Sequence, residues 1–325
     1  MDAMTIDCDR TTDIIVEFLR NKVAEDRKDG ICLGISGGVD SAVTAMLAMK
    51  AVQSPLQVHG LYLPDQDSEK KYRQRVFKLI DGLNINFQIV DFSKQAKAKG
   101  IYKSPLIKLF RISSRLNRLG LYLYNLTRKK SVNLNKLESD IHSGKNMANG
   151  FSKAIRHILQ KILLTPDITR GIVYRHILRR QILEEYAEKH NLLLIGAANK
   201  SQLLTGWFAP NGVDDLPVAP ILGLYKNQVI QMAEYLNVPQ DIINATPSPD
   251  MLKGIYDEDI IGFSYEKIDK VAYTIEHGLP KQNAFNENIT QREFNNIADL
   301  IQSTTTKQTN THDFPVFDKT AYYQV

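Results

Sequence analysis

The residues Ile31-Cys32-Leu33-Gly34-Ile35, followed directly by Ser36-Gly37-Gly38-Val39-Asp40-Ser41, decide the fold. The first five are mostly apolar and predict a buried strand, and the mostly apolar residues 42–49 predict a helix. A strand that feeds straight into a helix through glycines directs free backbone N–H groups and the positive end of the helix dipole at one point. The sequence therefore predicts a phosphate site at this turn.

The side chains of the turn support this prediction and add a metal. Ser36 and Ser41 supply hydroxyl donors, and two glycines let the backbone approach an anion. Asp40 would repel a phosphate unless a cation lay between them, so the chemistry implies Mg²⁺ bridging Asp40 and the phosphates. No Gly-Lys-Ser/Thr occurs in the chain, and the turn is not Gly-x-Gly-x-x-Gly, so it is neither a Walker A loop nor a dinucleotide turn.

Strands and helices alternate around this turn. The ranges 58–63, 86–90 and 192–196 predict further buried strands, and 9–25, 70–83 and 174–189 predict helices. The alternation predicts an α/β fold, a doubly wound parallel sheet with helices on both faces. Ligands of such sheets lie at the carboxyl ends of the strands, so residues 62–65 are either an adenosine contact or a plain surface turn.

Composition sets the wider limits. The chain has 325 residues, of which 43% are hydrophobic and 24% charged, and we expect a single domain over residues 1–325 with one excursion and a C-terminal tail at 303–325. Two cysteines, Cys8 and Cys32, provide no disulfide framework, so we expect a reducing, cytoplasmic setting. No signal peptide or membrane-spanning run is visible.

The net charge of +5 conceals a basic insertion, which we place at residues 94–170. Residues 97–161 contain 15 Lys or Arg but only two acidic residues, whereas the remainder has 26 basic and 34 acidic residues. A basic helical face is expected within the insertion, made of Lys108, Arg111, Arg115 and Arg118. This face fits a solvated lid, a lid over phosphates, or a contact with an anionic membrane or acidic partner. Residues 139–151 are expected to form a loop.

Candidate substrate residues follow the insertion. Arg175 and Arg179 share one face of the predicted helix 174–189 and are either surface charges or a fork that holds a phosphate or carboxylate. Residues 206–222 are too irregular for regular structure and predict a substrate loop that carries Asp214 and Asp215.

The turn at 34–41 resembles the pyrophosphate loop of the ATP pyrophosphatase superfamily. Five segments, in the order typical of the family, resemble NAD synthetases: GISGGVDS (34–41), GAANKSQLLTG (196–206), LYKNQV (224–229), TPSPDM (246–251) and YDEDIIGFSYEKID (256–269). The ending PVFD (315–318) resembles the family too.

The resemblance implies an ATP- and Mg²⁺-dependent amidation. The carboxylate of nicotinate adenine dinucleotide would attack the α-phosphorus of ATP and release pyrophosphate, and ammonia would then displace AMP. No glutaminase nucleophile is visible in the chain, so the ammonia would be free or supplied by a separate glutaminase. The resemblance also implies a homodimer.

Roles transfer to the matching positions. The loop would hold the phosphates of ATP, Asp40 the metal, Lys226 the ATP phosphates and Ser248 the nucleotide, and Arg179 would lie at the dinucleotide. The resemblance thus gives catalytic roles to Asp40 and Lys226 and extends ATP binding along the loop to Gly34, Ser36, Gly37, Gly38, Val39 and Ser41.

Several positions depart from the family pattern. Gln202 stands where a metal-binding Glu is usual, Ala197 where a Thr is common, and residues 208–211 where a Lys binds the dinucleotide. Asp214 or Asp215 would replace the family's substrate aspartate. The departures leave open an AMP-forming ligase for a different carboxylate, or one for a macromolecule such as tRNA docked on the basic insertion. The nucleic acid alternative ranks last because no known RNA-binding module is visible.

Overall fold

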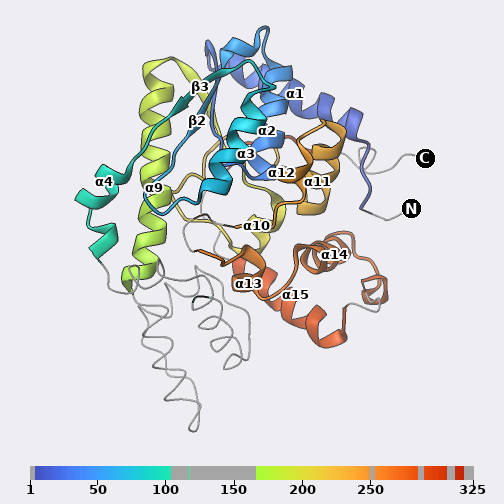
Figure 1. Cartoon of the computed structure of the whole chain (residues 1–325). Helices are drawn as coiled ribbons and strands as arrows, with labels where there is room; N and C mark the ends of the chain where they lie inside the picture. The colour runs from blue at the N-terminus through green and yellow to red at the C-terminus, as the bar shows by residue number, and fades with distance from the viewer. Residues whose placement is uncertain are drawn as a thin grey trace.

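The computed structural model describes residues 4–103, 117, 166–248, 250, 253–284, 289–305 and 312–317. Its centre is a four-stranded parallel sheet in the order β3-β2-β1-β4 (Figure 1). The strands are β1 (Gly30–Gly34), β2 (Val58–Tyr62), β3 (Asn86–Ile89) and β4 (Leu192–Ile195). The predicted parallel sheet is therefore confirmed, with each strand ending one residue earlier than expected.

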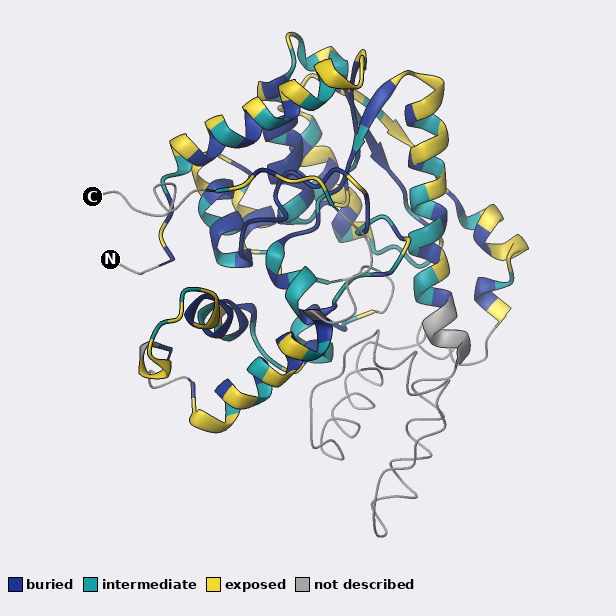
Figure 2. Cartoon of the chain, turned by 180° about the vertical axis from the view of Figure 1, so that it is seen from behind, coloured by how far each residue is buried: buried dark blue, intermediate teal, exposed yellow. Residues whose placement is uncertain are grey.

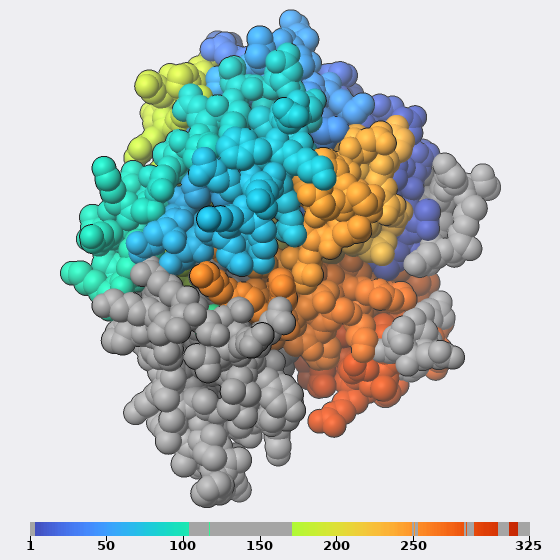
Figure 3. Space-filling model, in the orientation of Figure 1, coloured from blue at the N-terminus to red at the C-terminus, as the bar shows by residue number. Residues whose placement is uncertain are grey.

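One face of the sheet carries the larger core. Ile31 and Leu33 of β1 pack there among apolar side chains of five helices. These helices are α1 (Cys8–Glu25), α2 (Val39–Ala51), α3 (Lys70–Ile80), α11 (Lys226–Tyr235) and α12 (Gln240–Ile243). The space-filling view shows α3 in cyan beside α11 and α12 in orange (Figure 3), and Lys78 of α3 pairs with Asp241 of α12 at 2.8 Å.

The opposite face is covered by α9 (Pro166–Lys189), with α4 (Ser93–Ala98) and the short helix η2 (Ile101–Lys103) beside it. Cys32, which alternates with Ile31 and Leu33 along β1, packs here against Leu183. Burial raises the pKa of the Cys32 thiol to about 12. Helices on both faces confirm the doubly wound arrangement, and Figure 2 shows the exposed outer side of α9 in yellow.

The C-terminal helices form a second, smaller core below the sheet in Figure 1. They are α13 (Asp257–Ile261), α14 (Tyr265–Glu276), η3 (Lys281–Asn283) and α15 (Gln291–Thr305). Within the expected tail, α15 continues to Thr305, and residues 312–317 return to the body, where Asp313 bridges Val218 and Val218 bridges Ile195. The predicted irregular stretch 206–222 thus gains a short connection to the end of β4.

Two further helices complete the described part: η1 (Pro55–Gln57), capped by Ser54 before β2, and α10 (Lys200–Thr205) after β4. Among the described residues, no helix combines the length and the apolar character needed to cross a bilayer.

Of the basic insertion, the structure describes residues 94–103, Asn117 and residues 166–170. The face made of Lys108, Arg111, Arg115 and Arg118, and the loop 139–151, lie outside the described residues. At the first end, Ile101 and Tyr102 are buried in the core under α9. At the second end, α9 already begins at Pro166 instead of residue 174.

Candidate active site

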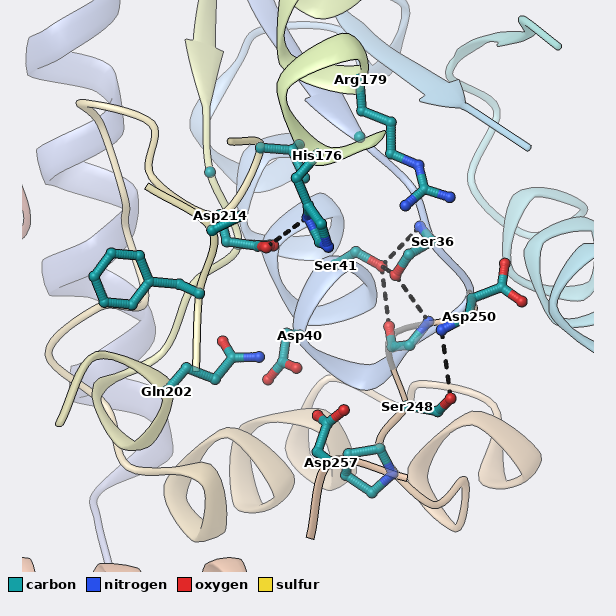
Figure 4. A pocket seen from close by; sticks show the side chains of 18 of the residues that line it. Ser36, Asp40, Ser41, His176, Arg179, Gln202, Asp214, Ser248, Asp250 and Asp257 are labelled. Carbon is teal, nitrogen blue, oxygen red and sulfur yellow. Dashed lines mark hydrogen bonds and ion pairs between the residues drawn. The ribbon is translucent and has the colours of Figure 1, made fainter. Parts of the chain in front are cut away.

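A pocket lies at the carboxyl ends of β1 and β4, where the strand order reverses: β2 and β3 lie on one side of β1, and β4 lies on the other (Figure 4). Its wall comes from the loop after β1, from α9, from residues 207–214 and from residues 245–250. The structure brings these predicted site residues to it: Gly34, Ser36, Gly38, Val39, Asp40, Ser41, Arg179, Gln202, Asp214, Lys226 and Ser248.

The loop after β1 is organised by its own serines. Ser36 Oγ lies 3.0 Å from Ser41 Oγ, and Ser41 Oγ donates to the Gly38 carbonyl at 3.0 Å. Gly37 has φ +80°, and a Cβ there would lie 2.7 Å from the Tyr72 carbonyl oxygen. The helix α2 starts directly afterwards, with Gly38 as an N-cap that offers no side-chain acceptor. Its first N–H groups are therefore available to an anion.

Asp40 and Lys226 form the charged centre of the pocket. Lys226 Nζ lies 2.6 Å from Asp40 Oδ2, and Asn199 Nδ2 donates to Asp40 Oδ1 at 2.9 Å. The Lys226 side chain is 4% exposed and its ammonium lies 5.6 Å from the Tyr265 ring centroid. A buried cation with one carboxylate partner beside an open phosphate loop is suited to binding a polyphosphate.

Asp257, at the start of α13, adds a second carboxylate that the sequence analysis did not single out. Its Oδ1 atom is buried and accepts no hydrogen bond from the described residues, while Oδ2 accepts one from Tyr265 at 3.3 Å. Burial raises the pKa of Asp257 to about 7, although nearby Lys226 opposes the rise. Figure 4 shows Asp257 and Asp40 facing the same part of the pocket, and no described trio of His, Cys, Asp or Glu could hold a metal ion.

The end of β2 forms the part of the pocket expected to contact adenosine. Tyr62 and Leu63 line it, and Arg179 Nε donates to the Leu63 carbonyl at 3.1 Å. The Arg179 guanidinium carbon lies 5.2 Å from the Phe92 ring centroid. Arg179 is thus held by backbone and ring contacts at the carboxyl edge of the sheet, within the pocket.

A polar pair, one residue from α9 and one from the loop 206–222, forms another part of the wall. His176 of α9 points into the pocket, and its Nδ1 lies 2.8 Å from Asp214 Oδ2. Phe208, Ala209 and Pro210 form the apolar surface beside them. His176 was not singled out by the sequence analysis, because a lone histidine on a helix carries no pattern.

Comparison with known proteins decides the family. The family model described as NAD synthase matches residues 11–111 and 166–311, well over half of the chain. The chain belongs to this family. It is 35% identical to the NH(3)-dependent NAD(+) synthetase of Coprothermobacter proteolyticus, over 82% of this chain and 85% of that protein. A second relative, the NH(3)-dependent NAD(+) synthetase of Methanocaldococcus jannaschii, is 28% identical over 91% of this chain and 92% of its own.

Solved structures agree on the fold of this NAD synthase family member. An NMN synthetase from Francisella tularensis superposes with a TM-score of 0.64 at 21% identity, covering 95% of this chain and 99% of that one. An NH3-dependent NAD synthetase from Campylobacter jejuni superposes with a TM-score of 0.61 at 21% identity, covering 95% and 99%. The family model passes over residues 112–165, which lie inside the basic insertion.

Three predicted residues of this NAD synthase family chain lie outside the pocket lining. Gly37 shapes the loop from behind. Arg175 is 2% exposed, pairs with Asp65 at 3.1 Å and with Asp67, and its guanidinium carbon lies 5.2 Å from the Tyr102 ring centroid. Its predicted role as a substrate fork is therefore replaced in the structure by a buried ion-pair network.

Asp215 is the third of these residues. Its Oδ2 accepts the Asn211 N–H at 2.7 Å and its Oδ1 lies 2.9 Å from His312 Nε2. Both carboxylate oxygens therefore brace the loop, whereas the neighbouring Asp214 faces the pocket.

Gln202 reaches the pocket but its amide oxygen is occupied. It accepts the backbone N–H of Asn199 at 3.1 Å, and Asn199 accepts the N–H of Gln202 at 3.0 Å. This reciprocal capping box starts α10. The predicted metal role of Gln202 would therefore compete with helix capping.

Asp250 was also missed by the sequence analysis. It lines the pocket near Ser248, and its Oδ1 accepts the Glu69 N–H at 3.1 Å. Burial raises its pKa to about 7, against the effect of Arg179. The segment around it resembles the family, but only the folded chain shows that this carboxyl is buried.

Proposed function

We propose that this protein is an ammonia-dependent NAD synthetase, which adenylates nicotinate adenine dinucleotide with ATP and converts the carboxylate to the amide. The observation that carries the proposal is the pairing of Lys226 with Asp40 at the open N-terminus of α2, inside the pocket at the sheet's switch point. The 35% identical relative bears the name of that activity.

The chain's own residues account for the first half-reaction. Backbone N–H groups at the start of α2 and the hydroxyls of Ser36 and Ser41 would hold the β- and γ-phosphates, which leave as pyrophosphate. Lys226 would stabilise the charge that develops on them. Tyr62 and Leu63 would contact the adenosine, with Ser248 also near the nucleotide.

The residues present fit Mg²⁺. Asp40 offers carboxylate oxygens at the loop, and Asp257 directs a buried oxygen without a hydrogen-bond partner among the described residues toward the same space. The bound metal would neutralise the phosphates next to these carboxylates. Lys226, which neutralises Asp40 here, would then be free to contact the phosphates.

The acceptor would enter between α9 and residues 207–214. Arg179 would lie near its phosphates and Asp214 near its nicotinate end. As the resemblance implies, we propose a homodimer that uses free ammonia or ammonia from a separate glutaminase. We place it in the cytoplasm, since Cys8 and Cys32 are both unpaired thiols.

A second candidate acid is suggested by one feature. The wall formed by Phe208, Ala209 and Pro210 offers no cation to the second phosphate of a dinucleotide. A smaller acid with the same pyridine carboxylate, nicotinate mononucleotide, would not need that cation.

ATP–pyrophosphate exchange with purified protein tests the proposal. We expect exchange that depends on nicotinate adenine dinucleotide and, after ammonium is added, a product one mass unit lighter than the acid. Exchange with nicotinate mononucleotide alone would establish the smaller acceptor. The absence of exchange with both acids would refute the proposed function.

A further inference from the structure

The pair His176 and Asp214 has a geometry that phosphate binding does not explain. His176 lies on the pocket wall, with its side chain 14% exposed and its Nδ1 2.8 Å from Asp214 Oδ2. Figure 4 shows the ring between Asp214 and the phosphate loop, above Asp40. The second ring nitrogen, Nε2, makes no hydrogen bond or ion pair with the described residues and is on the side of the ring away from Asp214.

The ring is held in place from the opposite loop. The Val213 N–H donates to the His176 carbonyl at 3.2 Å, and a Cβ at Gly212 would lie 2.7 Å from the His176 Cβ. Asp215 fixes the same loop through Asn211 and His312. The loop therefore packs closely on α9 and sets the position of Asp214 against the ring.

The charges around the ring favour one tautomer. Burial would raise the pKa of Asp214, but His176 and then Arg179 outweigh it, and the pKa is below its usual value. Asp214 is therefore an anion beside Nδ1, and a ring that carries its single proton on Nδ1 would present Nε2 as a lone-pair acceptor. The other acidic and basic side chains of the pocket lining are Asp40, Arg75, Arg179, Lys226, Asp250 and Asp257.

The proposed reaction needs a proton acceptor in its second half. When ammonia adds to the acyl-adenylate, the new C–N bond leaves a positive nitrogen, and a proton must leave it as the C–O bond to AMP breaks. Lys226 and Arg179 are cations, and Asp40 is engaged by Lys226 and Asn199. Among the described pocket residues, His176 offers an imidazole nitrogen for this proton, and the buried carboxyls of Asp250 and Asp257 are the alternative acceptors.

We propose that His176 is a catalytic residue that takes this proton on Nε2, with Asp214 orienting the ring. This inference rests on the proposed function. The electron pair of the broken C–O bond leaves with AMP, and the proton passes from nitrogen to Nε2 and then to water. Adenylation needs no such base, because the attacking carboxylate carries no proton.

The test separates the two half-reactions in the full-length protein. We expect His176→Gln to keep ATP–pyrophosphate exchange within about twofold and to slow amide formation about 10²-fold or more. Hydroxylamine, uncharged at neutral pH and with an adduct that loses its proton readily, should be used by this variant nearly as well as by the native protein. His190→Gln, just after the C-terminal end of α9, is the control and should change neither rate.

The outcomes are distinct from failure of the proposed function, which would remove exchange in the native protein. Unchanged amide formation in His176→Gln, or an equal loss of exchange and amide formation, would overturn the inference. If that variant does not fold, His176→Asn takes its place, with the same expectation for both rates. Unaltered amide formation in this second variant would again refute the role.

Discussion

The ion pair between Lys226 and Asp40 can be tested by a double-mutant cycle on stability. Lys226→Met removes the ammonium but keeps an apolar stem below the Tyr265 ring. Removing one partner of a buried pair costs about 3–5 kcal/mol. Asp40 is 18% exposed and keeps its hydrogen bond from Asn199, which lowers the penalty, so we expect about 2 kcal/mol of destabilisation.

The reverse change should cost more. Asp40→Asn leaves an ammonium whose side chain is only 4% exposed, and we expect about 3 kcal/mol. The double variant contains no uncompensated charge, so its loss should be smaller than the sum of the single losses by about 2 kcal/mol. The exposed pair Lys78 and Asp241 provides a matched control cycle, with an expected coupling of about 0.5 kcal/mol or less.

Urea unfolding of the native protein and the three variants, followed by circular dichroism, measures the coupling. If the two single effects add to within about 0.5 kcal/mol, the carboxylate and the ammonium do not interact in the folded protein. Such a result would refute the geometry on which the ATP site is built.

Three other predictions concern residues in the pocket wall or directly behind it. Gly37→Ala should lower the free energy of unfolding by about 1–2 kcal/mol and raise KM for ATP, because φ of Gly37 is +80° and a Cβ would meet the Tyr72 carbonyl. The control variant Gly38→Ala should change both quantities less. Equal effects of the two variants in unfolding and kinetic assays would contradict this prediction. The pKa of Asp250 rises from 3.8 unfolded to about 7 folded, so the folded state binds the extra proton and stability falls as pH increases between these values. Asp250→Asn should reduce this dependence of stability on pH in thermal melts recorded at a series of pH values. An unchanged pH dependence would contradict the raised pKa of Asp250. Gln202→Glu keeps the capping box and adds a negative charge, so this variant with bound ATP should bind Mn²⁺ about 10-fold more tightly than the native protein does. Electron paramagnetic resonance measures the Mn²⁺ affinity, and equal affinity in the two proteins would place residue 202 outside the metal site.

The sequence predicted those parts of the site that are contiguous in the chain. The phosphate loop is local, because strand, glycine turn and helix follow one another within residues 30–51, and its residues other than Gly37 line the pocket. Lys226 and Ser248, to which the resemblance gives contacts with ATP, also line the pocket.

The residues on α9 could not be assigned in this way. Helical periodicity placed Arg175 and Arg179 on one face. Arg175, however, forms buried ion pairs with Asp65 and Asp67, which precede it by more than a hundred positions in the sequence. Its neighbour His176 faces the pocket instead. A shift of one residue rotates a side chain by about 100° around a helix, so distant carboxylates decide which one meets the substrate.

The network around Arg175 also connects η2, near the start of the basic insertion, to α9, near its end. Tyr102, the penultimate residue of η2, donates to Asp65 at 3.0 Å, and Arg175 of α9 pairs with the same carboxylate. The end of η2 and the helix α9 therefore lie side by side, with a single carboxylate bonded to both. Closing a longer segment between two such neighbouring points adds only about 0.6 kcal/mol per doubling of length. We therefore expect that segments of different length can join these two points without a change in the nucleotide pocket.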